Sequence, residues 1–410
     1  MDLGLSPRVE KLRQQVRSMV QNEIMPAEHE YEAEIGKAKD GNRFAFTHRQ
    51  VEIREGLKSL AKQRGLWNFW LTDSDSGFGL TTLEYAHLAE EMGWSFLAPE
   101  IFNCSAPDTG NMEVLERFAS QAHRDKWLPD LLNGKIRSAY LMTEPAVASS
   151  DATNIALSAT RTKSGWLLNG EKWWASGAGD PRCEVYIVMA RTGNTDKPRH
   201  ERHSMFIMDS NTPGIEILRP MEVFGQDDAP HGHMHVRFND VKIPADSVIL
   251  GEGRGFEVAQ GRLGPGRIHH CMRAIGQAER AFEMMCRRAV GREAFGRPLA
   301  KLGANPDIIA NCRTEIDMAR LLCLRTSHLM DTAGVPASQA AISQIKVVAP
   351  QVALKVVDEA IQMHGAMGIS QDSPLAKMWT ALRTLRFADG PDAVHRAQVA
   401  KAALREYNYS

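Results

Sequence analysis

The sequence has few cysteines, almost no net charge and no long apolar run. Its six cysteines are scattered without CxxC spacing, so they predict free core thiols in a reducing compartment. The formal net charge of −1 argues against a nucleic-acid or membrane surface as the main partner. Residues 1–20 carry charges throughout and lack the apolar core of a secretory signal. No apolar run approaches the roughly eighteen residues of a membrane span, so we expect a cytoplasmic protein without a span.

Helical patterns occupy both ends of the chain. The 410 residues allow two or three domains, and 43% apolar and 24% charged residues are ordinary for a globular protein. Residues 1–136 are predicted to be helical because Val9, Leu12 and Val16 recur at helical spacing. Helical spacing returns after residue 256 and continues to residue 407, and Pro350 should kink this region or mark a boundary in it.

The middle of the chain has β character. Asn169-Gly170 stands between two apolar runs, which predicts a hairpin turn at this dipeptide. In residues 234–238, Met, Val and Phe alternate with polar residues at period two, as in a strand with one buried face. The fold class is therefore predicted to be α+β, mostly α.

Several short segments carry residues suited to a phosphate-bearing ligand or to acid–base chemistry. Glycines at 365 and 368 expose backbone N–H groups, and Arg292 offers a planar fork that donates in pairs to a pyrophosphate. Asp389 precedes Gly390-Pro391, and an acid at such a break can face a cavity. No GxGxxG occurs, so a Rossmann dinucleotide site is not predicted.

In order and spacing, the segments 142–145, 173–176, 292–297, 362–368 and 387–392 resemble the acyl-CoA dehydrogenase family of flavoproteins, over roughly residues 1–408. The resemblance implies an N-terminal α-helical domain at 1–136, a central β barrel-like domain at 137–250 and a C-terminal four-helix bundle at 251–410. Segments 264–267 and 388–392 look closest to the branch of family members ten and eleven and their bacterial relatives.

The resemblance implies FAD as the cofactor. Two departures from the family pattern concern this site: the loop 146–149 is one residue longer, and Gly303 stands where many members carry an adenine-binding Gln. The residues expected to contact FAD, some of them across a subunit interface, are Met142, Thr143, Ser149, Ser150, Trp174, Ser176, Arg292, Phe295, Gln362, Gly365, Ala366, Gly368, Pro391 and Asp392.

The family removes a proton from Cα and a hydride from Cβ of an acyl-CoA thioester, as in fatty acid β-oxidation. Asp389 matches the position of the family's base, with Asp392 as its competitor, and a base needs partial desolvation and reach to the proton. Ser150, Arg267 and Gly390 are expected to bind substrate. Gly264 and Gly266 predict a roomy pocket and hence a long-chain or 4-hydroxylated acyl group.

His231, His233 and His235 alternate along a predicted strand, and three imidazoles on one face can bind zinc. We expect instead a polar, solvent-facing strand surface and no metal site, because no cysteine or carboxylate cluster accompanies them.

The resemblance further implies a homodimer or homotetramer and an electron-transfer flavoprotein as electron acceptor. Two alternatives keep the fold. One is a flavin oxidase, acting on acyl-CoA or resembling nitroalkane oxidase. The other is a non-catalytic, nucleic-acid-binding flavoprotein, against which the charge balance argues.

Overall fold

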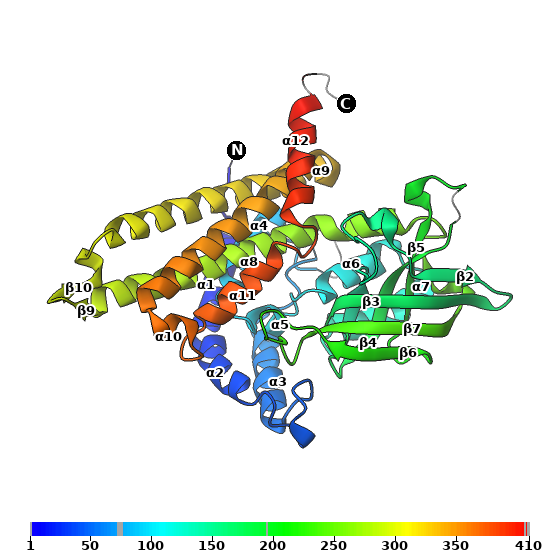
Figure 1. The fold of residues 1–410 in the computed structure, drawn as a ribbon, viewed down its shortest axis with the longest axis horizontal. Helices are drawn as coiled ribbons and strands as arrows, with labels where there is room; N and C mark the ends of the chain where they lie inside the picture. Colours follow the sequence, from blue (N-terminus) through cyan, green and yellow to red (C-terminus); the bar gives the residue numbers. More distant parts are fainter. Residues whose placement is uncertain (1, 72–76, 194–195, 406, 408–410) are drawn as a thin grey trace. The chain divides into compact units, whose positions relative to one another are not determined.

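The computed structural model describes residues 2–71, 77–193, 196–405 and 407 (Figure 1). The chain forms two compact units. One consists of Met1–Glu28, Phe69–Pro99 and Gly264–Ser410, and the other of His29–Asn68 and Glu100–Leu263. We call them the bundle unit and the sheet unit and describe each by itself.

The sheet unit is built on one eight-stranded sheet of order β6-β7-β3-β2-β4-β5-β8, with β1 paired to β4. Its helices are α3 (His48–Gln63), α6 (Asp108–Phe118) and α7 (Gln121–Leu132), together with the ends of α2 (Met25–Ala33) and α5 (Ala98–Ile101), which begin in the bundle unit. The strands are β1 (Arg137–Leu141), β2 (Ser158–Arg161), β3 (Gly165–Ser176), β4 (Cys183–Arg191), β5 (His203–Asp209), β6 (Ile215–Pro220), β7 (His233–Pro244) and β8 (Val248–Ile249). Most neighbouring strands are antiparallel, whereas β4 pairs in parallel with β1 and β2.

The core of this unit follows from alternation along its strands. Met234, Val236 and Phe238 are buried in β7, as the period-two pattern predicted. The ring of Trp166 in β3 meets that of Phe206 in β5 edge to face, with 5.2 Å between centroids. Buried apolar surface of this kind is the main force that stabilises a sheet.

The hairpin predicted at Asn169-Gly170 is wrong. Both residues lie inside β3, which pairs with β7 on either side of them. The register shifts between Leu168 and Gly170, and Gly170 has φ +140, so the dipeptide forms a bulge instead of a turn. At the bulge, Asn169 Nδ2 donates a hydrogen bond to Asp240 Oδ1, and Asn169 Oδ1 accepts one from the backbone N–H of Asp240.

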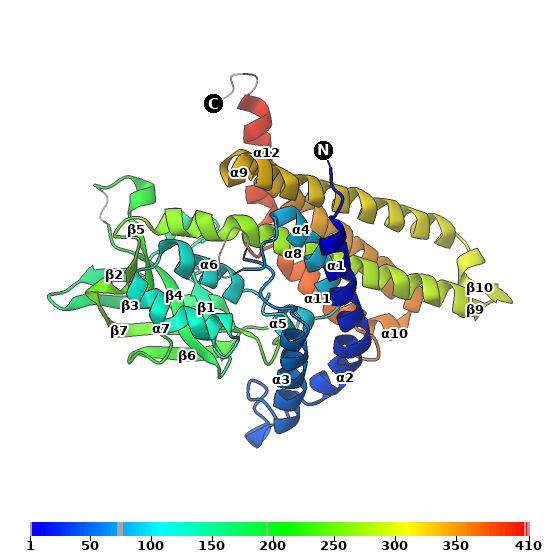
Figure 2. The ribbon, with the colours of Figure 1, turned by 180° about the vertical axis from the view of Figure 1, so that it is seen from behind.

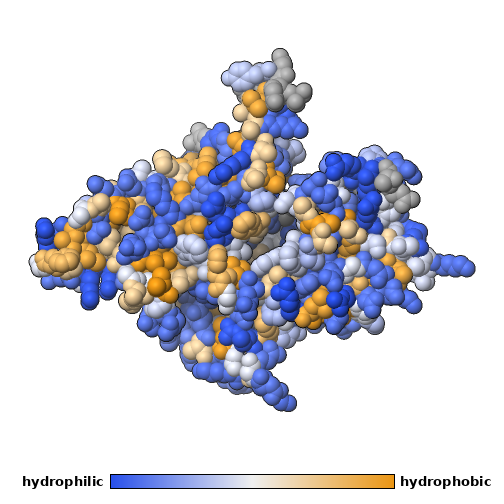
Figure 3. Space-filling model, in the orientation of Figure 1, coloured by the Kyte–Doolittle hydropathy of each residue, from blue (hydrophilic) through white to orange (hydrophobic). Residues whose placement is uncertain are grey.

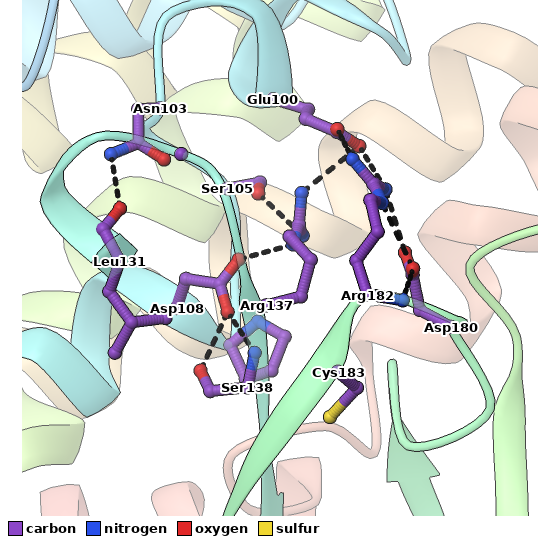
Figure 4. Close-up of polar contacts among 12 residues, drawn as sticks. Glu100, Asn103, Ser105, Asp108, Leu131, Arg137, Ser138, Asp180, Arg182 and Cys183 are labelled. Carbon is purple, nitrogen blue, oxygen red and sulfur yellow. Dashed lines mark hydrogen bonds and ion pairs between the residues drawn. The ribbon is translucent and has the colours of Figure 1, made fainter. Parts of the chain in front are cut away.

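A cluster of buried ion pairs joins the helical and β segments of the sheet unit (Figure 4). Arg137 pairs with Asp108 at 2.5 Å and with Glu100 at 3.0 Å. Arg182 pairs with Glu100 at 2.6 Å and with Asp180 at 2.7 Å. Burial opposes ionisation of Glu100, but these guanidinium groups and a nearby lysine outweigh it and hold its pKa well below the ordinary value.

The bundle unit is almost entirely helical (Figure 2). α9 packs against α4, α11 and α12, and α1 packs against α4. Besides a short hairpin of β9 (Glu293–Ala294) and β10 (Arg297–Pro298), its helices are α1 (Pro7–Met19), α4 (Thr82–Met92), α8 (Gly255–Gly291, which begins in the sheet unit), α9 (Asn305–His364), α10 (Ala366–Ile369), α11 (Leu375–Leu385) and α12 (Asp392–Arg405). The predicted order of helical, β and helical regions is confirmed.

The longest helix, α9, runs through Pro350 without a boundary, so the predicted break lies elsewhere. Its one departure from helical geometry among the described residues is Gly334, with φ +80. By length and composition α9 is the one described helix that could cross a membrane. Just over half of its most apolar window is buried inside the protein, as expected of the core helix of a bundle.

Candidate active site

Asp389 lies in the short loop between α11 and α12. It adopts the left-handed backbone region with φ +55, which is uncommon for a residue with a side chain, and Gly390 follows with φ +105. A Cβ at Gly390 would lie 2.9 Å from the ring of His395, so only glycine fits there. Backbone held in such a conformation is typical of functional loops.

The carbonyl of Asp389 is held by two buried donors. Arg267 Nε donates to it at 3.3 Å from α8, and His395 Nε2 donates at 3.2 Å from α12. Burial and the nearby Arg267 and Lys346 lower the pKa of His395 to about 4, so its ring is neutral at pH 7. Because Nε2 donates, Nδ1 is the acceptor, and it faces Ser343 Oγ at 3.4 Å.

Asp392, the other candidate for the base, accepts several hydrogen bonds through its carboxylate. Its Oδ2 accepts two hydrogen bonds from Arg386, at 2.9 and 2.6 Å, and one from Gln351 at 2.9 Å. Burial opposes ionisation of Asp392, but these donors outweigh it and lower its pKa. A carboxylate stabilised in this way is a poor proton acceptor, so Asp392 is poorly suited to act as a base.

A second group of predicted residues comes together around the C-terminal end of α8 and the two ends of α9. A cavity of about 380 Å³ is lined by Arg292, Gln362 and Gly365, which the sequence placed in two separate segments. It is also lined by Arg288, whose Nε is buried and has no hydrogen-bond partner among the described residues. Two guanidinium groups, an amide and a glycine backbone suit a pyrophosphate.

The hairpin beside this cavity points an apolar side chain outward. Phe295 is 95% exposed and has φ +52. Val290, Met367 and Ile369 are also exposed, and apolar residues reach the surface around β9, β10 and α10 (Figure 3). Of the other residues predicted here, Ala366 is exposed and Gly368 is buried. Surface of this kind fits a contact with a further subunit.

In the sheet unit, the segment 142–144 is fixed to β3 by a buried ion pair. Lys172 Nζ lies 2.8 Å from Glu144 and donates to the carbonyl of Met142 at 2.9 Å. The carboxylate of Glu144 also accepts from the backbone N–H groups of Ala156 and Leu157. Burial lowers the pKa of Lys172 to about 8 although Glu144 opposes the shift.

The two serines of the following loop differ. Ser149 accepts a hydrogen bond from the backbone N–H of Glu144 at 2.9 Å, so its hydroxyl stabilises the loop, whereas Ser150 is exposed. Thr143 is exposed as well, and its carbonyl accepts from the N–H of Trp173. Their predicted contacts with FAD stay predictions.

Trp174 and Ser176 lie at a bulge of β3. The register with β7 shifts between Lys172 and Ala175, and Trp174 has φ +53. Ser176 Oγ lies 2.8 Å from Nδ1 of His233, whose ring also lies 5.9 Å from that of Trp174. A bulge re-aims side chains, and here it brings the predicted ring contacts beside a histidine that the sequence did not connect with them.

The prediction of a solvent-facing histidine surface is wrong. The side chains of His233 and His235 are only 17% and 13% exposed, because they pack against Trp174 and Trp173. His235 Nε2 contacts Glu171 at 2.9 Å. Among the described residues, no group of three or more histidine, cysteine or acidic side chains could hold a metal ion.

Three family models match nearly the whole chain: the N-terminal domain of acyl-CoA dehydrogenase over residues 6–135, the middle domain over 139–241 and the C-terminal domain over 253–404. The chain belongs to the acyl-CoA dehydrogenase family. The resemblance inferred from its motifs and the fold class are thereby confirmed.

Close relatives come from animals and bacteria. Acyl-CoA dehydrogenase family member 10 of Mus musculus is 49% identical over 98% of this chain, which spans 37% of that relative's length. Acyl-CoA dehydrogenase FadE2 of Mycobacterium tuberculosis is 47% identical over 98% of this chain and 97% of its own. This chain therefore spans about half or less of the length of the animal relatives but nearly all of the bacterial one.

Solved structures share the fold. An acyl-CoA dehydrogenase from Mycobacterium abscessus has a TM-score of 0.93 with 48% identity, covering 98% of this chain and all of the other. A structure described as an FAD complex of PigA has a TM-score of 0.82 with 21% identity, covering 99% of this chain and 100% of the other.

Three residues near the predicted sites were missed by the sequence analysis. Arg288 stands four positions before Arg292, a spacing that places both on one helix face and could have revealed it. His270 is brought to Asp389 by the packing of helices, whereas His395 stands six residues after Asp389 in the next helix. No local pattern marks either histidine.

Proposed function

We propose that this protein is an FAD-dependent acyl-CoA dehydrogenase in which Asp389 removes the α-proton of an acyl-CoA thioester. The observation that carries the proposal is the contrast between the two acids. Arg386 and Gln351 occupy Asp392, whereas the loop of Asp389 is fixed through its backbone carbonyl. Fixing the backbone of Asp389 limits where its carboxylate can lie, as positioning of a catalytic base requires.

The residues present fit FAD. Arg288 has a buried donor without a partner among the described residues, beside Arg292 and the glycine turn at Gly365, and these would hold the pyrophosphate. The bulge of β3 presents Trp174 and Ser176 for the ring, next to the clamped segment 142–144. When bound, FAD supplies an acceptor for the hydride that leaves Cβ.

The protein's own groups serve the other half of the chemistry. Asp389 takes the proton from Cα, and its backbone N–H is a donor for the thioester oxygen as negative charge develops there. Arg267 is buried and keeps the loop in place from α8. Burial lowers the pKa of its guanidinium, although Asp389 opposes the shift.

For the acyl group we propose a long or 4-hydroxylated chain, since the resemblance associates the branch of family members ten and eleven with such chains. The motifs at 264–267 and 388–392 and the 49% identity to family member 10 support this choice. Of the two glycines expected to widen the pocket, Gly264 does not support this choice. A Cβ at Gly264 would lie 2.9 Å from Val335 Cγ1, so this glycine serves the packing of α8 on α9. Gly266 has no atom within 4 Å of such a Cβ and keeps open space beside Arg267.

An anaerobic substrate screen tests the proposal. Purified protein loaded with FAD is mixed with acyl-CoAs of increasing length, with and without a 4-hydroxyl, and the loss of flavin absorbance is followed. We expect all suitable acyl-CoAs to bleach the flavin and longer chains to bind more tightly. The binding free energy should improve by roughly 0.8 kcal/mol for each further methylene that is buried. No bleaching by any acyl-CoA would overturn the proposal, and better kcat/KM for butyryl-CoA than for twelve-carbon chains would overturn its substrate.

We further propose a homodimer or homotetramer that passes electrons to an electron-transfer flavoprotein. The exposed hairpin at Phe295, beside the cavity lined by Arg288 and Arg292, supports completion of the FAD site by a second subunit. Fast reoxidation by oxygen with release of peroxide would instead identify an oxidase of this fold.

A further inference from the structure

Two adjacent histidines on α8 have different surroundings. His269 is buried, and its ring meets that of Tyr85 edge to face at 4.5 Å. His270 lies on the side of Asp389, with Nε2 at 3.5 Å from Asp389 Oδ2. The side chains of His270 and Asp389 are 26% and 20% exposed, so the pair is partly shielded from water.

A neighbouring arginine determines which ring nitrogen of His270 carries the proton. Arg273 lies one turn further along α8 and is buried, and its Nη2 lies 3.4 Å from His270 Nδ1. A guanidinium can only donate, so Nδ1 must be the acceptor. The proton of the neutral ring therefore stands on Nε2, the nitrogen that faces the carboxylate.

The backbone of Asp389 cannot readily adjust to this neighbour. Its carbonyl is held by Arg267 and His395, and its φ of +55 is fixed by the loop. With the backbone fixed, the torsions of the side chain decide where each carboxylate oxygen points. A donor beside Oδ2 selects among these rotamers.

We infer that His270 is a positioning residue for the α-proton base: its Nε2–H attracts Oδ2 of Asp389 and thereby selects the rotamer of the carboxylate. This inference rests on the proposed function of Asp389. It concerns how the carboxylate is aimed, and it assigns His270 no contact with substrate or flavin.

The electrostatic surroundings of the pair are cationic or neutral. Lys346, buried in α9, and Arg267 both act on Asp389, and burial lowers the pKa of each. Among the described residues, the titratable and charged groups around the pair include Arg267, His269, Cys271 and Arg273 on α8, Lys346 on α9 and His395 on α12. His269 and His395 are neutral near pH 7 because burial lowers their pKa values, and His270 is the histidine whose ring lies beside the carboxylate.

The first test measures flavin reduction by excess acyl-CoA in single turnovers of the FAD-loaded enzyme. In His270→Phe we expect the limiting rate to fall by roughly tenfold or more with little change in the half-saturating substrate concentration, because only the aim of the base is lost. His270→Gln should recover much of that rate, since an amide N–H can replace Nε2–H, and it should remove the contribution of His270 to the pH profile. His48→Gln, at a histidine whose side chain is 89% exposed on α3, is the control.

The second test needs neither substrate nor activity. With histidine labelled by ¹³C at Cε1, the titration midpoint of His270 is compared between wild type and Asp389→Asn, and His270→Gln assigns the resonance. We expect the midpoint to fall by about one unit in Asp389→Asn, because the carboxylate that stabilises the imidazolium is gone. The midpoint of His48 should not move.

The outcomes separate the inference from the function on which it rests. If Asp389→Asn reduces flavin at the wild-type rate, Asp389 is not the base, and His270 then has no base to position. Loss of reduction in Asp389→Asn, together with wild-type rates and pH profile in His270→Phe, would overturn the role of His270 alone. If His270→Phe fails to fold, His270→Gln and the titration decide: an unchanged pH profile and midpoint overturn the inference, and shifts in both support it.

Discussion

Arg386 binds Asp392 Oδ2 through two N–H groups, at 2.9 and 2.6 Å. Arg386 lies three residues before Asp389 and Asp392 three residues after it, so the pair spans the loop that carries Asp389. Asp392 stands in the first turn of α12, and we propose Asp389 as the acid that accepts a proton. Exchange of each carboxylate for an amide therefore distinguishes them.

Asp389→Asn should reduce flavin more slowly by roughly 10²–10⁴-fold, because it removes a general base while nearly preserving shape. Its FAD content should match wild type. Asp389→Glu should keep part of the activity, since the family's usual base is one methylene longer. Asp392→Asn should lose stability and keep its rate per bound flavin. Stopped-flow bleaching checks these outcomes, and the reverse pattern would make Asp392 the base.

Arg292→Glu and Arg288→Gln should each lower FAD content, because both guanidinium groups line the cavity and suit a pyrophosphate. The flavin-to-protein absorbance ratio after purification measures this. Arg287→Glu is the matched control, since Arg287 stands on the same helix, is 80% exposed and pairs with Glu283. Equal FAD content in all three variants would contradict the assignment of the cavity.

The predicted assembly has a test of its own. Sedimentation of the FAD-loaded protein should give a dimer or tetramer, and Phe295→Asp should weaken it, because this side chain is 95% exposed at the hairpin tip. A charge at the centre of an interface is costly to bury. A wild-type monomer that keeps FAD and activity would rule out a shared site.

Stability should fall as the pH drops from about 6.5 toward 4, partly because of His395. Burial lowers its pKa from 6.5 to about 4, so across this range the unfolded chain binds a proton that the folded chain does not. Stability from this group is present above pH 6.5, and up to roughly 3 kcal/mol is lost by pH 4. Urea unfolding at several pH values gives the free energy of unfolding as a function of pH. This free energy should change less steeply with pH in His395→Gln than in wild type, and an equally steep change would show that His395 does not contribute.

Arg182→Ala should destabilise the sheet unit by about 3–5 kcal/mol, because it leaves Glu100 and Asp180 buried with fewer cationic partners (Figure 4). Arg49→Ala removes a half-exposed pair with Glu30 and should cost at most about 1 kcal/mol. Urea unfolding compares the two variants, and similar losses in both would show that burial of the cluster does not matter.

Gly264→Ala and Gly266→Ala test the two glycines before Arg267. A Cβ at Gly264 meets Val335 at 2.9 Å, whereas a Cβ at Gly266 meets nothing within 4 Å. We expect Gly264→Ala to lower thermal stability by roughly 1–3 kcal/mol and Gly266→Ala to raise it by up to about 1 kcal/mol, since alanine favours helix. A stable Gly264→Ala that prefers shorter acyl chains would instead return Gly264 to the substrate pocket.

The sequence by itself determined much of this protein. Periodicity separated helical from β regions, since side-chain direction repeats every 3.6 or 2 residues whatever the partner. The segments around Arg292, Gln362 and Asp389 each keep their chemistry within a few consecutive residues, so their family could be recognised without a structure. Asn169-Gly170 shows the limit, because a turn-forming dipeptide became a bulge when β7 paired along the whole of β3.

Only the tertiary structure revealed the neighbours of the two acids. Arg386 lies six residues before Asp392, but Gln351 lies 41 residues before it and Arg267 lies 122 residues before Asp389. His270, 119 residues before Asp389, likewise takes its proposed role from packing between helices. A hydrogen bond depends on distance and angle in space, and for partners so far apart in the chain these are determined by how the helices pack and by no local pattern.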